Sequence, residues 1–270
     1  MLPAAGAEDR LASWQAQWDT KKTGWHMRDV SPVLTKHLKE LFPADAPGAR
    51  MLFPLCGKTV DMAFMALSGY QVVGVDGVKQ AIYEFAAEQG ATATPMPAEL
   101  PRGFDNTRFC GYSVMPRAPR SSGPGASLWG CCCGGQEQGV TPQPVTLIQG
   151  DFLAMGRQEA QSLVPFEAAF DRGSLVAVKP ADRQQYMTAL AELIAPGGKV
   201  LLEAFEHDPF HNGRLGPPFE VTEAQLRELC DGRFEVRPLS RRDALADMRH
   251  MGSTYFFVCV YLLQRIAPAK

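Results

Sequence analysis

From residue 50 onward, short apolar runs alternate with amphipathic stretches, a pattern typical of βαβ units around a parallel sheet. Strands are predicted over residues 50–55, 71–76 and 199–205, and residues 145–152 and 167–175 are each predicted to be a strand that leads into a loop. Helices are predicted over residues 60–68, 79–89 and 181–194. The first two helices end at Gly69 and Gly90, and glycine readily adopts the left-handed conformation that follows a helix. The alternation indicates an α/β fold with a doubly wound sheet.

The last part of the chain departs from the parallel pattern. Two strands are predicted over residues 234–239 and 255–263, joined by a connection too short for a further packed helix with its crossover, so they should pair antiparallel. Before them, Thr222 and Gln225 form a capping box that opens a helix reaching Cys230. We therefore expect a single domain over residues 1–270, with about seven strands and an antiparallel C-terminal hairpin.

The charge balance argues against a polyanionic partner. The 270 residues include 27 Lys and Arg against 29 Asp and Glu, a formal net charge of -2. Binding to nucleic acid or anionic lipid needs a clustered positive field. The three arginines within residues 237–242 are followed by Asp243, and we interpret them as a solvated strand end. No nucleic acid and no membrane is expected as a partner.

The N-terminus, MLPAAGAEDR, has no apolar core preceded by basic residues, and no run in the chain approaches the length of a membrane span. A cytoplasmic location is expected, where the seven cysteines stay reduced. Cys131, Cys132 and Cys133 lack the spacing of a metal site and are predicted to be free thiols. They belong to a Pro-, Gly- and Ser-rich stretch, residues 113–144, which is predicted to be a flexible insertion.

Candidate chemistry begins with LFPLCGKT, residues 52–59, which ends like a phosphate-binding loop but contains one glycine. A true loop of that kind needs a glycine where Leu52 stands, and the dinucleotide fingerprint GxGxxG is also absent. Lys58 and Thr59 are therefore predicted to open a helix. Asp76 closes the next strand 19 residues after Gly57, where an acid accepts hydrogen bonds from both ribose hydroxyls. A helix N-cap is the alternative role of Asp76.

A ribose-binding acid without a phosphate cradle fits S-adenosylmethionine, whose adenosine carries a sulfonium and an amino-acid tail in place of phosphates. A second feature lies in GDF, residues 150–152, at the end of another predicted strand. Asp151 there is positioned to accept the adenine amino group, with the ring of Phe152 beside the base. An Asx turn that closes the strand explains Asp151 equally well.

Several motifs resemble the thiopurine S-methyltransferase family. They are WQAQW, TGWH, FPLCGK, VVGVD, DRGSLVAV, GPPF and a late Arg-His pair, and they extend from Trp14 to Gln264 on both sides of the insertion. The resemblance implies a class I, Rossmann-like methyltransferase that uses S-adenosylmethionine, works as a monomer and needs no metal. The family methylates aromatic and heterocyclic thiols. It also has bacterial members linked to selenium and tellurium methylation, and relatives that methylate halides or small thiols.

The resemblance also implies residue roles for the cofactor. It assigns residues 1–30 to an N-terminal lid, in which aromatic faces suit a sulfonium cation and a flat acceptor. A hydrophobic cap over the sheet is an equal alternative for Trp14 alone. The residues implied around the cofactor are Trp14, Trp18 and Trp25 in the lid, Leu55 and Gly57 at the methionine part, Asp76 at the ribose, and Asp151 and Phe152 at the adenine.

For the acceptor, the resemblance points to Trp25, Arg172 and Arg249. Arg172 is expected to orient an anionic thiolate and to lie beside the cofactor's methyl group, and its neighbour Asp171 to hold the loop or touch the cofactor's amino group. A structural ion pair is the alternative for either arginine. Heterocyclic thiols ionise near neutral pH, so no strong general base is required.

No other arrangement competes for the chemistry. The histidines, which show no metal-binding spacing, are His26, His37, His207, His211 and His250. The sequence therefore predicts an enzyme that methylates the sulfur of aromatic and heterocyclic thiols, thiopurines included, from S-adenosylmethionine. Two alternatives stay open. One is a methyltransferase for another small nucleophile, such as a selenium or tellurium compound, a halide or a small thiol; the other is a catalytically silent binding protein.

Overall fold

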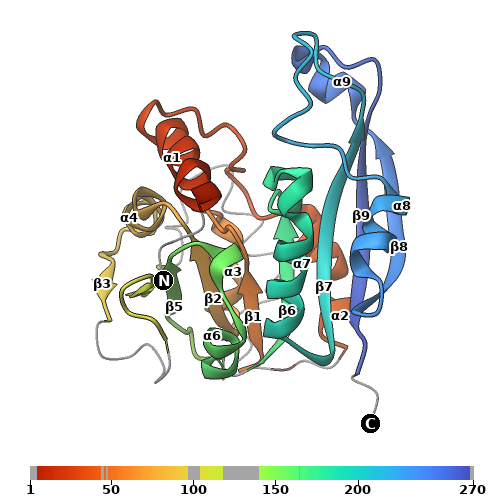
Figure 1. The fold of residues 1–270 in the computed structure, drawn as a ribbon. Helices are drawn as coiled ribbons and strands as arrows, with labels where there is room; N and C mark the ends of the chain where they lie inside the picture. Colours follow the sequence, from red (N-terminus) through yellow and green to blue (C-terminus); the bar gives the residue numbers. More distant parts are fainter. Residues whose placement is uncertain are drawn as a thin grey trace.

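A computed structural model describes residues 5–43, 46, 48–96, 104–117, 140–163 and 165–267. These residues form one mixed sheet in the order β3-β4-β5-β2-β1-β6-β7-β9-β8 (Figure 1). The strands are β1 (Arg50–Phe53), β2 (Gln71–Asp76), β3 (Thr94–Pro95), β4 (Cys110–Val114), β5 (Val145–Gln149), β6 (Phe166–Arg172), β7 (Ile194–His207), β8 (Phe234–Asp243) and β9 (Phe256–Arg265). The α-helices are α1 (Ala5–Asp19), α2 (Pro32–Leu41), α3 (Val60–Leu67), α4 (Lys79–Glu88), α6 (Arg157–Ser162), α7 (Arg183–Leu193), α8 (Glu223–Cys230) and α9 (Leu245–Met248).

The seven predicted strands are all present, and the α/β class is confirmed. β5, β2, β1, β6 and β7 run parallel, whereas β9 is antiparallel to both β7 and β8. The antiparallel C-terminal hairpin is therefore confirmed, although its connection contains the short helix α9 and a 3-10 turn, η4 (Arg249–Met251). The reversal of strand order on either side of β1 is the switch point at which α/β proteins bind ligands.

The described residues form nine strands, two more than the seven predicted. β3 and β4 extend the sheet beyond β5, and β4 pairs antiparallel with it. The predicted start of the insertion is wrong for the same reason, because Ser113 and Val114 belong to β4 and lie opposite Thr146 and Val145. The three adjacent cysteines at 131–133 lie outside the described residues.

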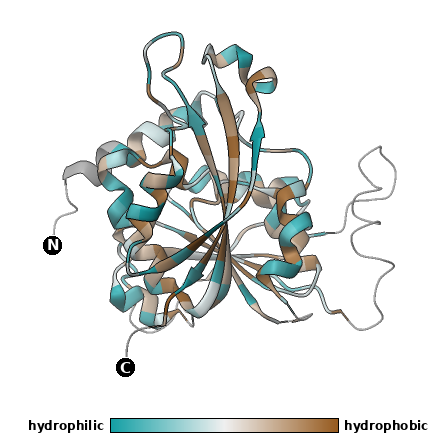
Figure 2. Cartoon of the chain, turned by 90° about the vertical axis from the view of Figure 1, so that its right-hand side faces the viewer, coloured by the Kyte–Doolittle hydropathy of each residue, from teal (hydrophilic) through white to brown (hydrophobic). Residues whose placement is uncertain are grey.

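Both faces of the sheet are covered, which explains the nearly continuous apolar strands. Met51 and Phe53 of β1 join the core under α2, α3 and α4, whereas Leu52 between them joins the core under α6, α7 and α8. Each fully buried side chain of this size stabilises the fold by roughly 1.5–3 kcal/mol. Figure 2 shows long hydrophobic stretches along the strands, while the helices alternate hydrophobic and hydrophilic residues. No helix among the described residues is long and apolar enough to cross a membrane.

Local signals place the elements that carry the site. Thr59 caps α3, its side chain accepting the N–H of Asp61, as the helix start at LCGKT predicted. The capping box of Thr222 and Gln225 is present at α8. Gly74 within β2 is required by close packing, because a Cβ there would stand 2.6 Å from the Met62 sulfur. β2 and α3 are thereby pressed together behind the turn that follows β1.

Candidate active site

The turn after β1 is tied directly to the end of β2. The Cys56 N–H donates to the carbonyl oxygen of Val75 at 2.9 Å, and the Gly57 N–H donates to Asp76 Oδ2 at 2.7 Å. Leu55 has φ +41° and Gly57 has φ +52°, a left-handed conformation that disfavours residues other than glycine. The distance of 19 residues between Gly57 and Asp76 thus corresponds to a hydrogen bond between two neighbouring strand ends.

Asp76 binds a second backbone group, the N–H of Val78, through Oδ1 at 2.8 Å. The side chain is 9% exposed, and burial raises its pKa to about 6 although both N–H groups oppose the shift. An ionised carboxylate has about four lone-pair positions, so two remain for the hydroxyls of a ribose. The N-cap residue of α4 is Val78 and not Asp76. The acceptor positions left on the Asp76 carboxylate therefore fit the ribose role.

Four aromatic rings from the N-terminal segment gather beside this turn. Trp25 lies edge-on to Trp14 at 5.5 Å and to Trp18 at 6.3 Å between ring centroids. His26 lies 5.2 Å from Trp18 and 5.5 Å from Trp25. Trp18 is buried against Val78 and Ala81 at the start of α4, which holds α1 across one end of the sheet beside α4 (Figure 1). Trp25 is 41% exposed, so part of its aromatic surface is open to solvent.

From the sequence, His26 was considered only as a metal ligand, but the structure places it at the site. Its Nε2 accepts the Lys58 N–H at 3.2 Å, and its Nδ1 lies 3.1 Å from the carbonyl oxygen of Thr23. Burial lowers its pKa to about 4, which agrees with a neutral ring that donates from Nδ1 and accepts at Nε2. A Cβ on Gly57 would stand 2.4 Å from this Nε2, so His26 closely covers the glycine turn.

A second contact fixes the N-terminal helix on the far side of the site. Arg10 of α1 pairs with Asp151 at 2.6 Å and with Asp182 at 3.2 Å. Asp151 also accepts the Leu153 N–H at 3.1 Å, so the Asx turn considered for it is present. Phe152 has no exposed surface and packs against Tyr186 at 5.2 Å. The structure thus places Asp151 at the rim, next to α1, and the ring of Phe152 in the core.

The DRG stretch places its two charged residues in different surroundings. Asp171 is fully buried and accepts hydrogen bonds from the Tyr186 hydroxyl at 2.7 Å and from the N–H groups of Ser174 and Leu175. Burial raises its pKa to about 6 against these hydrogen bonds. Asp171 therefore holds the loop. Arg172 is half-buried and donates through Nη2 to the carbonyl oxygen of Trp25 at 3.3 Å, so β6 and the N-terminal segment meet there.

Arg249 belongs to the connection between β8 and β9. It lies in η4, is exposed, and has no side-chain partner in the part of the chain that the structure describes. The connection between β8 and β9 folds into α9 and η4 next to the carboxyl end of β7, where His207 lies opposite Phe256 (Figure 1). That Arg249 shares the acceptor pocket with Arg172 stays a prediction.

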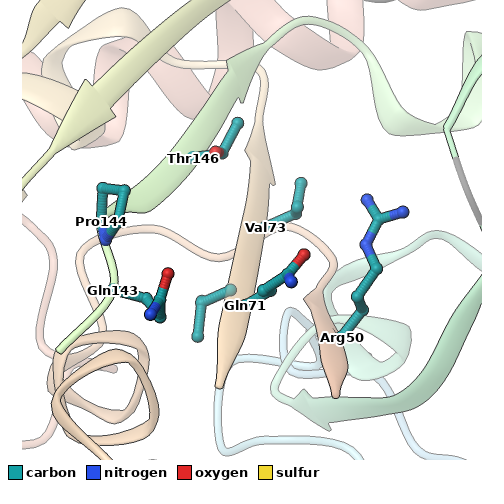
Figure 3. Close-up of a pocket in the computed structure, with 7 residues that line it drawn as sticks. Arg50, Gln71, Val73, Gln143, Pro144 and Thr146 are labelled. Atoms are coloured by element: carbon teal, nitrogen blue, oxygen red, sulfur yellow. The ribbon is translucent and has the colours of Figure 1, made fainter. Parts of the chain in front are cut away.

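The pocket drawn in Figure 3 belongs to the opposite end of the sheet. It is lined by Arg50, Gln71 and Pro144, which stand at or next to the amino ends of β1, β2 and β5. The turn of Gly57, Asp76 and the DRG loop all lie at the carboxyl ends of their strands. Because ligands of open α/β sheets bind at the carboxyl ends, the pocket of Figure 3 is not the candidate active site.

Solved structures with a similar fold are S-adenosylmethionine-dependent methyltransferases. One from Methanosarcina mazei has a TM-score of 0.51 at 15% identity and covers 88% of this chain and 99% of its own. The 1,6-didemethyltoxoflavin-N1-methyltransferase of Burkholderia thailandensis, solved with S-adenosylhomocysteine, has a TM-score of 0.52 at 16% identity and covers 99% and 93%. The fold and the site define a class I methyltransferase.

The family follows from sequence. The profile of the thiopurine S-methyltransferase family matches residues 10–111 and 132–266. The thiopurine S-methyltransferase of Oryctolagus cuniculus is 32% identical over 255 residues, which cover 94% of this chain and 89% of the relative. That of Pseudomonas paraeruginosa is 29% identical, covering 93% and 97%. The chain belongs to the thiopurine S-methyltransferase family, and it is an S-adenosylmethionine-dependent methyltransferase.

The residues present fit this cofactor. The carboxylate of Asp76 has acceptor capacity left for a ribose, Leu55 and Gly57 form a left-handed turn beside it, and aromatic rings of the N-terminal segment lie next to that turn. Two further acids near Arg172, Asp61 and Glu203, were not predicted as site residues from the sequence. Asp61 binds the Ser31 N–H and the Thr59 hydroxyl, each at 2.7 Å, and Glu203 lies buried in β7. An acid inside the apolar run KVLLEAF was the visible signal for Glu203.

Proposed function

We propose that this methyltransferase transfers a methyl group to the sulfur of aromatic and heterocyclic thiols, thiopurines among them. The observation that carries the proposal is the hydrogen bond from Arg172 to the backbone of Trp25, because it joins the cation at the carboxyl end of β6 to a residue whose indole is exposed. A guanidinium binds an anionic sulfur and an indole stacks on a flat ring. Family membership supports the same acceptor class, since its relatives bear the name of thiopurine S-methyltransferases.

The mechanism needs positioning more than acid–base chemistry for such acceptors. Bound S-adenosylmethionine supplies an electrophilic methyl group on a sulfonium. Arg172 would hold the thiolate beside the cofactor's methyl group, and such positioning can lower the barrier by several kcal/mol, about 7–11 at most. Asp76 would hold the ribose, and Leu55 and Gly57 would hold the methionine part. Asp171 keeps the loop of Arg172 in place through Tyr186.

We further propose that residues 1–30 act as a lid over the cofactor. Three contacts support this role. The Arg10 side chain pairs with the Asp151 carboxylate, the Lys58 N–H donates to the His26 ring, and the Arg172 side chain donates to the carbonyl oxygen of Trp25. They join the segment to the strand ends of β5, β1 and β6. A lid excludes water from the sulfonium and strengthens the electrostatic contacts of the site.

The test is methyl transfer from labelled S-adenosylmethionine to 6-mercaptopurine, thiophenol and selenite, with a reaction lacking acceptor as the blank. Products from both thiols support the proposal. Methylation of selenite alone would assign the chain to another small nucleophile. Cofactor binding without any product would leave the methyltransferase class standing and contradict the acceptor.

The role of Arg172 is tested separately. Replacement by alanine should lower the turnover of an anionic thiol far more than it weakens S-adenosylhomocysteine binding. Equal losses in both measurements would make Arg172 a structural residue.

A further inference from the structure

A buried acid stands next to Arg172 on the neighbouring strand. In the parallel pairing of β6 with β7, Arg172 lies opposite Glu203, and adjacent strands are about 4.8 Å apart. Glu203 is 8% exposed, while Leu201, Leu202 and Ala204 around it are buried and apolar. A carboxyl group in such a strand is costly to bury without a partner. Its position at the carboxyl end of the sheet places it beside the proposed acceptor pocket.

Glu203 and Arg172 each present an unsatisfied polar atom. Glu203 Oε1 and Arg172 Nε are both buried and have no hydrogen-bond partner among the described residues. The two side chains also form no ion pair within 4.0 Å of each other in the described part of the chain. Buried polar atoms in native proteins are nearly always hydrogen-bonded. An acceptor molecule that enters beside Arg172 can provide the missing partner for both atoms.

Four charged groups from three elements face Glu203. Burial, which is the largest effect, raises its pKa to about 7, Asp61 of α3 and Asp171 of β6 act in the same direction, and Arg172 of β6 and Arg242 of β8 act against them. A carboxyl group that ionises near neutral pH exists partly as the carboxylate under ordinary conditions. It can therefore take a proton from a substrate and release it again at the same pH.

We propose that Glu203 is the general base that removes the proton from acceptor thiols that are not already ionised. The proposal rests on the proposed S-methylation and adds a catalytic residue to it. The S–H proton passes to the Glu203 carboxylate and its bonding electrons remain on sulfur. The thiolate sulfur then forms a bond to the methyl carbon, the electron pair of the broken bond stays on the cofactor's sulfur, and protonated Glu203 returns its proton to water.

This role extends the range of acceptors. Acidic aromatic thiols arrive as thiolates and need only Arg172, whereas aliphatic thiols are protonated at neutral pH and need a base. Glu203 should therefore matter in proportion to the basicity of the thiol. The matched control is Glu206, three residues along the same strand, whose carboxylate is paired with Arg241 at 2.9 Å and has no part in the proposed pocket.

The experiment compares kcat/KM at pH 7 for 2-mercaptoethanol, a protonated thiol, with that for 4-nitrothiophenol, an ionised one. Glu203→Gln should lower the ratio of the first to the second at least ten-fold, near the low end of what a general base contributes, about 10²–10⁴-fold. Glu206→Gln should leave the ratio at the wild-type value. With 2-mercaptoethanol, the wild-type rate should level off above a pKa near 7, and the glutamine variant should instead rise up to the pKa of the thiol.

The outcomes separate the two proposals. If both thiols are methylated by the wild type and Glu203→Gln leaves the ratio unchanged, the base is not Glu203 while S-methylation stands. If the wild type methylates no thiol, both proposals fall. Should the glutamine variant not bind S-adenosylhomocysteine, the wild-type pH profile alone decides, because a rate with 2-mercaptoethanol that follows only the ionisation of the thiol overturns the role of Glu203.

Discussion

At the residue scale, Asp76 joins the glycine turn to the second strand and keeps free acceptor capacity for a ligand. We predict that Asp76→Ala lowers the affinity for S-adenosylhomocysteine about ten- to hundred-fold, because hydrogen bonds to a charged group contribute about 1.5–3 kcal/mol. Titration calorimetry measures this. Glu235→Ala, at an exposed position of β8, is the control and should bind like the wild type. Unchanged affinity in the Asp76 variant would remove the ribose assignment.

Glu203 gives a pH-dependent prediction that is independent of activity. Its pKa rises from 4.5 to about 7 on folding, mainly through burial, so the folded state holds the proton more tightly than the unfolded state. The free energy of unfolding of the wild type therefore falls as the pH rises from about 4.5 to about 7, because over this range Glu203 loses its proton in the unfolded state but still holds it in the folded state. The full decrease is about 3 kcal/mol. Glutamine does not titrate. Urea unfolding at pH 5 and pH 8 should show Glu203→Gln gaining stability over the wild type at pH 8; a difference independent of pH would contradict the buried, proton-holding state.

The residues of the site divide by the kind of signal they leave in the sequence. Asp76, Gly57 and Arg172 occupy strand ends or turns, which are recognisable from spacing. His26 is different, because its role depends on the N-terminal segment folding back over Gly57, a contact between residues 31 positions apart. The role of Arg249 stays a prediction, because its sequence neighbours do not determine the path of the β8–β9 connection. The sequence pattern does not determine where a loop lies relative to segments that are distant along the chain.

At the element scale, α1 is held to the site by few contacts and should respond to the loss of one. Arg10→Ala removes the pairs with Asp151 and Asp182, which link the helix to the ends of other elements. We predict faster hydrogen exchange in residues 10–26 and a several-fold weaker affinity for S-adenosylhomocysteine, since a partly exposed ion pair contributes up to about 1 kcal/mol. Arg227→Ala, which breaks a pair within α8, should change neither. Identical exchange in both variants would contradict the lid.

The elements themselves were largely predictable. Long periodic stretches gave α3, α4, α7 and the seven strands, because alternation and capping residues are local properties. The strands β3 and β4 were missed since one has two residues and the other borders a Gly- and Pro-rich stretch without clear alternation. β1 ends at Phe53, two residues earlier than predicted. β5 and β6 end at Gln149 and Arg172 and lead, as predicted, into loops, which contain 3-10 helices.

At the scale of the whole molecule, one sheet with a core on each face connects all described strands, and we propose that the chain works as a single domain. The residues between β4 and β5 should then be dispensable. Val114 and Val145 lie opposite each other in the antiparallel pair, so the two strand ends are adjacent. The family profile leaves residues 112–131 unmatched.

We predict that replacing residues 118–139 by a short Gly-Ser linker preserves S-adenosylhomocysteine affinity and the unfolding midpoint within a few degrees. The reason is that loop closure depends weakly on length, about 0.6 kcal/mol for each doubling. Thermal unfolding and calorimetry measure both quantities. A variant that no longer binds the cofactor would show that this stretch is part of the functional domain.

We propose that this member of the family methylates sulfur. The most direct measurement is the structure of the product formed from 6-mercaptopurine and methyl-labelled S-adenosylmethionine, determined by NMR of the labelled methyl group, with S-adenosylhomocysteine quantified alongside. We expect the label on the exocyclic sulfur, with one S-adenosylhomocysteine formed for each product. Label on a ring nitrogen, or no labelled product from an enzyme that binds the cofactor, would contradict the claim.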